Sequence, residues 1–109
     1  MLEPLFESDI KEKILFFLYS HGEGYAREIC RTFQFNLSTV QNQLLKLESH
    51  GVLYSSLKGR VRLFGFNPRY PFKRELDALL KKAMMFLPED EVRKYYWPRL
   101  RPRRTGKPF

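Results

Sequence analysis

The sequence has few of the residues that build catalytic or metal sites. Among 109 residues there are one cysteine and two histidines, and the histidines have no pairing at helical spacing with the thiol. A single cysteine excludes an internal disulfide and fits a reducing compartment. Paired carboxylates, a phosphate-binding glycine loop and a nucleophile elbow are also absent, so the sequence argues against an enzyme and predicts no cofactor and no metal site.

Long hydrophobic runs are missing as well. No stretch is apolar enough to span a bilayer, and the short acidic N-terminal segment does not fit a secretory signal, so we expect a cytoplasmic protein. Hydrophobic residues still make up 43% of the chain and aromatic residues 16%, which predicts a folded domain rather than a disordered chain. At this length we expect one domain with a modest core.

Acidic residues are absent from the end of the chain. Residues 1–91 carry thirteen Lys and Arg against all twelve acids, and residues 92–109 carry the other seven basic residues. Basic arms on balanced domains usually bind polyanions. The prolines of this end prevent a regular helix or a central strand. We therefore expect an extended arm that contacts phosphates through Arg101, Arg103 and Arg104.

The central stretch, residues 25–50, predicts two short helices joined by a tight turn. The first covers residues 26–33. The second begins near Ser38, where Ser38 and Gln41 fit a capping box. Its apolar residues fall at helical spacing and predict one buried stripe: Val40, Leu44 and Leu47. Its opposite face carries side chains that can pair with base edges in a major groove: Ser38, Thr39, Gln41, Asn42 and Lys46.

A β-hairpin is predicted behind this helix. Gly51 ends the helix, and two strand-like runs follow at residues 52–57 and 60–66. Because a strand sends alternate side chains to opposite faces, we expect Val61 and Leu63 to point to the core. The other face would then carry the basic residues that can bind phosphates or enter a minor groove: Lys58, Arg60 and Arg62.

In this arrangement the chain resembles winged helix–turn–helix regulators of the ArsR/MarR type. The likeness rests on AREIC for the supporting helix, STVQNQLLKLESHGVL for the recognition helix and GRVRLFGFNP for the returning strand. It covers residues 5–87 and is strongest to short prokaryotic winged-helix proteins and to the winged-helix part of nucleotidyltransferase-linked regulators. It implies an α+β fold, with a three-helix core and a small antiparallel β-wing. It also implies sequence-specific double-stranded DNA binding by a homodimeric regulator at the nucleoid.

The helices on either side of this unit are unusually apolar. We expect a first helix over residues 9–19, capped by Ser8, and a long helix over residues 72–87. In the regulators that the chain resembles, these two helices build the dimer. The expected dimer contacts are Phe16, Leu76, Leu80, Met84 and Phe86. For the first helix, a wide core face is an equally good interpretation.

Two further features lie on the supporting helix and near the C-terminus. Metal-sensing members of the family that this chain resembles have a Cys-x-Cys pair on the supporting helix. This chain has only Cys30 there, which we interpret as a buried apolar residue. After Pro88 we expect a short aromatic helix that folds back on the domain or on a partner. We therefore divide the chain into a winged-helix domain, residues 1–87, and an aromatic helix with a basic tail, residues 88–109.

Two other functions fit the same sequence. Winged helices and arginine-rich tails also bind RNA, so an RNA- or ribosome-associated module is one alternative. The second is a protein-interaction adaptor, or an antitoxin-like partner of a neighbouring gene product. This alternative arises because the segment after residue 87 is too short to hold a ligand pocket of its own.

Overall fold

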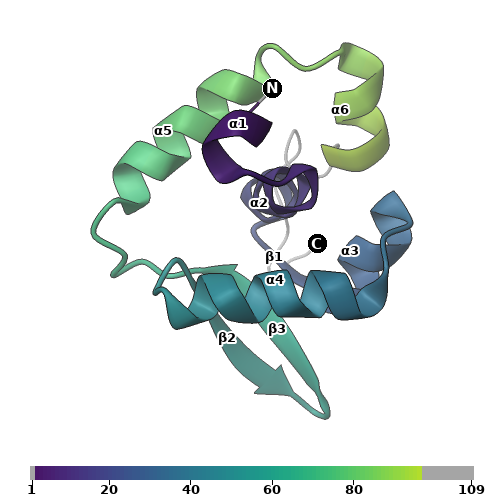
Figure 1. Cartoon of the computed structure of the whole chain (residues 1–109), viewed down its shortest axis with the longest axis vertical. Coiled ribbons are helices and arrows are strands. Elements are labelled where there is room, and N and C mark those ends of the chain that lie inside the picture. The colour runs from purple at the N-terminus through teal and green to yellow at the C-terminus, as the bar shows by residue number, and fades with distance from the viewer. Residues whose placement is uncertain (1, 97–109) are drawn as a thin grey trace, which may run out of the picture.

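The structure is a computed structural model that describes residues 2–96. Over this range the chain is α+β, as predicted, and its elements follow in the order α1 (Glu3–Phe6), α2 (Asp9–His21), β1 (Glu23–Tyr25), α3 (Ala26–Phe33), α4 (Leu37–Ser49), β2 (Leu53–Lys58), β3 (Val61–Phe66), α5 (Lys73–Met84) and α6 (Glu89–Tyr96). Helix α2 lies at the centre (Figure 1). On one side of it are α3, α4 and the sheet, and on the other are α1, α5 and α6. No helix in the described range is long and apolar enough to cross a membrane.

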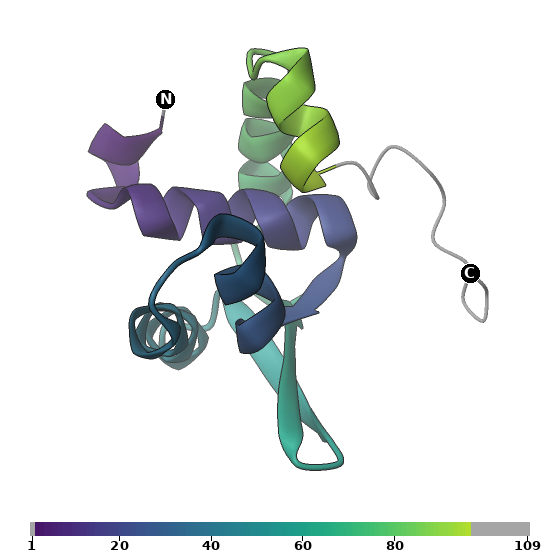
Figure 2. The same ribbon diagram turned by 90° about the vertical axis from the view of Figure 1, so that its right-hand side faces the viewer.

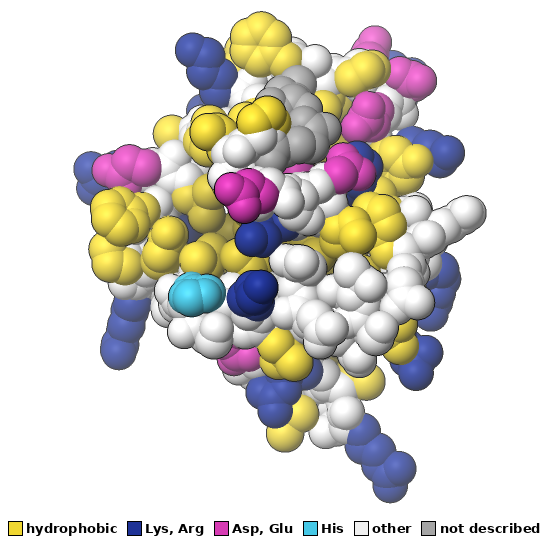
Figure 3. All heavy atoms as spheres, in the orientation of Figure 1, with side chains coloured by type: hydrophobic (Ala, Val, Ile, Leu, Met, Phe, Trp, Pro, Cys, Tyr) yellow, Lys and Arg dark blue, Asp and Glu magenta, His cyan; other side chains and the backbone are white. Residues whose placement is uncertain are grey.

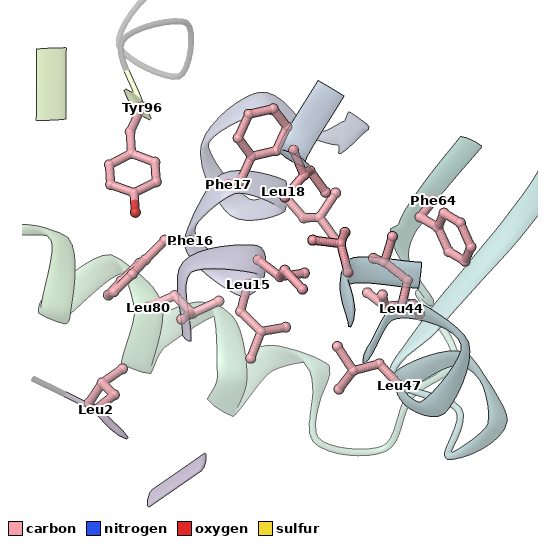
Figure 4. Packing of buried hydrophobic residues seen from close by; sticks show 14 of the residues in the cluster. Leu2, Leu15, Phe16, Phe17, Leu18, Leu44, Leu47, Phe64, Leu80 and Tyr96 are labelled. Atoms are coloured by element: carbon pink, nitrogen blue, oxygen red, sulfur yellow. The ribbon is translucent and has the colours of Figure 1, made fainter. Parts of the chain in front are cut away.

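Helix α2 is the centre of the core. Its predicted cap is confirmed, because the Ser8 side chain accepts a hydrogen bond from the Lys11 backbone N–H at 3.0 Å. Five consecutive apolar residues, 14–18, are buried, so every side of the helix there is covered by its own chain. The side chains of this core converge from both halves of the molecule (Figure 4). The wide apolar surface of α2 is therefore used within one subunit.

The short helix α1 was not expected from the sequence. It packs against α2, and the Leu2 backbone N–H donates to Glu12 Oε2 at 2.9 Å. Both residues are buried. A hydrophobic pattern does not count a charged residue as part of the core. Periodicity therefore did not predict that the N-terminal segment packs on the domain through Glu12.

The helix–turn–helix consists of α3 and α4. Helix α3 has the predicted bounds, but the predicted capping box of α4 is wrong. The N-cap is Asn36, whose Oδ1 accepts from the backbone N–H groups of Ser38 at 2.9 Å and Thr39 at 3.3 Å. Both Asn and Ser are good caps, and the tight turn through Gln34, which is left-handed at φ 61°, lets the helix start earlier. Ser38 is consequently a first-turn residue.

The sheet has the strand order β1-β3-β2 and is antiparallel throughout. Tyr25 lies in the short third strand, as expected, where it pairs with Leu63. The hairpin turns at Gly59-Arg60, one residue later than predicted, and Gly59 has a φ of 66°. That left-handed conformation is one that glycine adopts without steric cost.

The predicted faces of the wing are wrong. The cross-strand pair Ser55 and Phe64 lies on one face of the hairpin. The pair Leu57 and Arg62, two positions nearer the tip, lies on the same face. Phe64 is buried, so Arg62 lies on the face that turns to the helices, and Val61 lies on the opposite face with its partner Lys58. The hairpin extends beyond the core at its tip, where both faces meet solvent (Figure 2). Near the tip, a basic residue can therefore lie on either face of the hairpin, so the positions of the basic residues do not predict which face is inward.

Helices α5 and α6 complete the core from the far side of α2. Helix α5 is shorter than predicted, so Phe72 and Phe86 lie outside it. Helix α6 follows Pro88, as expected, and its last residue, Tyr96, packs against Phe16 with ring centroids 5.8 Å apart. The aromatic helix therefore folds back on its own domain. Arg101, Arg103 and Arg104 lie outside the described residues.

Candidate nucleic-acid interface

Helix α4 presents a polar face away from the core. Its buried side is the predicted stripe of Val40, Leu44 and Leu47. The predicted reading residues lie on the other side, where Thr39 is half-buried and the rest are exposed: Ser38, Gln41, Asn42 and Lys46. The surface over α4 carries mostly uncharged polar groups, while acidic side chains gather towards the half of the molecule formed by α1, α5 and α6 (Figure 3). The helix is therefore accessible to an anionic partner.

A groove of about 390 Å³ runs between α4 and the wing. Gln41 and Leu45 line its helix side, and Arg60 and Arg62 line its wing side. The wing extends away from the helical part of the molecule, beside α4 (Figure 2). One side of the groove is therefore a helix and the other is the hairpin. In winged-helix proteins bound to DNA, a recognition helix occupies a major groove and a wing can reach the neighbouring backbone or minor groove.

The Arg62 side chain is held near the tip of the wing, two residues after the hairpin turn. Its Nη1 donates to Ser55 Oγ at 3.0 Å, and the Ser55 hydroxyl donates to Glu48 Oε2 at 2.7 Å. This chain of hydrogen bonds connects β3 through β2 to the last turn of the recognition helix. It fixes the wing relative to α4 and keeps the Arg62 guanidinium on the groove side.

The three predicted basic residues of the wing do not share one face. Lys58 lies opposite Val61 on the outer face, Arg60 is in the turn, and Arg62 lies in the groove. Together they surround the tip instead of forming a stripe along it. All three are exposed, so they can contact phosphates on different sides of the wing.

Arg27 is a candidate contact that the sequence analysis missed. It lies in the first turn of α3, is exposed, and lines the end of the groove beside Tyr25. The signal was present in the sequence, because a basic side chain at the N-terminal turn of a helix adds to the positive potential of that end. That Arg27 lines the groove follows only from the packing of α3 beside the wing.

The ion pairs of the described residues lie away from this surface. They join Lys13 to Asp9, Lys73 to Asp77 and Arg93 to Glu89, each within one helix. Within residues 2–96, no ion pair involves a residue of α4 or the hairpin. Arg62 reaches the Glu48 carboxylate only through the Ser55 hydroxyl, so the basic side chains around the groove have no direct ion pair and their charge is available to a phosphate backbone.

Cys30 lies in the last turn of α3, just before the turn that leads to α4. Its side chain is half-buried, and its thiol donates to the Phe35 carbonyl oxygen at 2.6 Å. The neighbouring rings of Phe33 and Phe35 stack with centroids 5.3 Å apart. Within residues 2–96 no group of three or more His, Cys, Asp or Glu side chains is placed to hold a metal ion.

Two of the expected dimer contacts are corrected by their burial. Phe16 is 1% exposed and Leu80 0%, because α6 and α5 cover α2 within the same chain. Leu76 and Met84 are half-buried, and Phe86 is 68% exposed. The exposed apolar side chains in this region are Phe72, Leu79, Met85 and Phe86. These side chains, unlike Phe16 and Leu80, are accessible at the surface.

The element order and the sheet define a winged helix–turn–helix protein. No family model matches the sequence, and no curated protein matches it either. Solved structures that share the fold include the YusO protein from Bacillus subtilis (23% identity, TM-score 0.59, 84% of this chain and 73% of that chain). They also include a double mutant of ZitR from Lactococcus lactis in its apo form (16%, 0.53, 80% and 76%) and the adhesin competence repressor AdcR from Streptococcus pyogenes (15%, 0.55, 91% and 77%). At these identities the likeness establishes the fold, and the winged helix implied by the sequence resemblance is confirmed.

Proposed function

We propose that the protein is a non-enzymatic transcriptional regulator that binds specific sequences of double-stranded DNA as a homodimer. The observation that carries this proposal is the groove between an exposed polar helix and an arginine-lined wing. The similarity of fold to AdcR, a repressor by name, supports the same function.

The recognition helix would enter the major groove. The amides of Gln41 and Asn42 can each pair with adenine through two hydrogen bonds, and Lys46 can pair with guanine or a phosphate. Ser38 and Thr39, in the first turn, are near the positive end of the helix and suit phosphate contacts that fix the register.

The wing and the tail would supply contacts to the backbone. Lys58, Arg60 and Arg62 would bind phosphates or enter the minor groove, with Arg27 adding a contact from α3. Arg101, Arg103 and Arg104 would add affinity that depends on salt but not on sequence.

Self-association would use the exposed apolar residues at the end of α5. Met85 is 77% exposed and Phe86 68%. Monomeric proteins rarely leave large apolar patches in water, and a two-fold dimer presents two recognition helices to a palindromic site. We expect such a regulator to act in the cytoplasm, at the nucleoid.

Selection of bound sequences from a random duplex pool tests the proposal. We expect enrichment of an inverted repeat, with competition by unselected duplex at a much higher concentration. The same protein should be offered single-stranded and duplex RNA of random sequence. Tighter binding to RNA than to every selected DNA duplex would refute the proposal in favour of an RNA-binding module. Absence of nucleic-acid binding would refute it in favour of a protein adaptor.

A further inference from the structure

Leu45 is an apolar side chain on the polar face of the recognition helix. The other leucines and the valine in the middle of α4 are buried, whereas Leu45 is 51% exposed. An exposed leucine is ordinary on a protein surface by itself. Its neighbours and its position in the groove make this one informative.

The surroundings of Leu45 are those of a base-reading side chain. It follows Gln41 by four residues and Asn42 by three, so it lies beside both on the helix surface. With Gln41 it forms the helix side of the groove, across from Arg60 and Arg62 of the wing. A partner that places phosphates against the wing would therefore bring its base edges to Leu45 and the two amides.

We propose that Leu45 contacts the 5-methyl group of a thymine and so determines sequence specificity. This inference rests on the proposed function. In the major groove thymine is distinguished by its methyl group, and apolar side chains contact it. Gln41 and Asn42 can pair with adenine, whose partner across the base pair is thymine, so one face of α4 reads both members of A·T pairs.

Uracil substitution tests this contact without changing base pairing. Each thymine of a selected duplex is replaced in turn by uracil, which removes only the methyl group. Affinities are measured by fluorescence anisotropy for the unaltered protein and for Leu45→Ala. We expect the unaltered protein to lose about fourfold in affinity at one or two positions, the factor for burying one methyl group. Leu45→Ala should bind the thymine duplex more weakly and be insensitive to uracil at those positions.

Leu5→Ala is the matched control, because Leu5 is an exposed leucine on α1, on the other side of α2. It should keep the full uracil effect, and far-UV circular dichroism should show all three proteins folded. Binding with no uracil effect in the unaltered protein, or with the same effect in Leu45→Ala, overturns the inference alone. Failure to bind any duplex overturns the proposed function and the inference with it.

Discussion

The hydroxyl of Tyr96 provides a test of the core. The residue is fully buried, and its ring packs on Phe16 among the residues that cover α2 (Figure 4). Its hydroxyl oxygen has no hydrogen-bond partner among the described residues. Leaving a buried polar group unsatisfied costs about 1–3 kcal/mol. Tyr96→Phe removes that group and keeps the ring, so we expect the free energy of unfolding to rise by about 1 kcal/mol.

The alkaline limb of stability gives an independent readout. Burial of the hydroxyl, together with the nearby Glu91 carboxylate, raises the pKa of Tyr96 above its ordinary value of 10.0. The folded state therefore keeps its proton where the unfolded chain loses it. This titration leaves the free energy of unfolding unchanged below pH 10 and lowers it above pH 10, by about 1.4 kcal/mol for each pH unit. Tyr96→Phe should lack this part of the decline.

Urea denaturation between pH 7 and pH 11 measures both effects. Tyr95→Phe is the control, since it removes a hydroxyl from a half-buried neighbour in the same helix. We expect the stability difference between Tyr96→Phe and the unaltered protein to grow above pH 10. Tyr95→Phe shows what the loss of a less buried hydroxyl does under the same conditions. If Tyr96→Phe destabilised the protein at pH 7 by more than about 1 kcal/mol, the hydroxyl would have a hydrogen-bond partner. The reasoning would then be wrong.

Three further predictions concern the interface and the assembly. Asn36→Ala should lower the free energy of unfolding by about 1 kcal/mol, because it removes the N-cap of α4. Ser38→Ala should lower it less, and equal losses in urea denaturation would contradict the assigned cap. Asn42→Ala should reduce the preference for the selected site over random duplex by about 1–3 kcal/mol. Deletion of residues 99–109 should instead lower the affinity for both duplexes by similar factors and make that affinity less dependent on salt. Anisotropy at two salt concentrations distinguishes these results, and loss of discrimination on tail deletion alone would assign base reading to the tail. Finally, sedimentation of the unaltered protein at micromolar concentration should give twice the chain mass. Phe86→Glu should lower the sedimenting mass towards that of the monomer, because a charge would be buried at the interface. An unaltered protein that sediments as a monomer would refute the dimer.

The local order of this domain could be read from short stretches of sequence. Helix α3 has the predicted bounds, and Ser8 caps α2 as expected, because both depend on hydrogen bonds and periodicity within a few residues. The polar face of α4 was also predictable, since Val40, Leu44 and Leu47 fall on one side at helical spacing and leave the other side to polar residues and Leu45. The same periodicity could not choose between Asn36 and Ser38 as the cap, because both suit that position.

The tertiary structure decided which surfaces face outward. The surplus of apolar residues on α2 was equally consistent with a partner subunit or a wide core, and the placement of α5 and α6 settled it by burying Phe16. Arg62 turned to the groove because Phe64, two residues further along the strand, packs on the helices and sets the face of β3. Arg27 and Leu45 come together with the wing although they are distant from it in sequence. Such relations depend on how elements pack against one another, and a hydrophobic pattern records only that each element has a buried side.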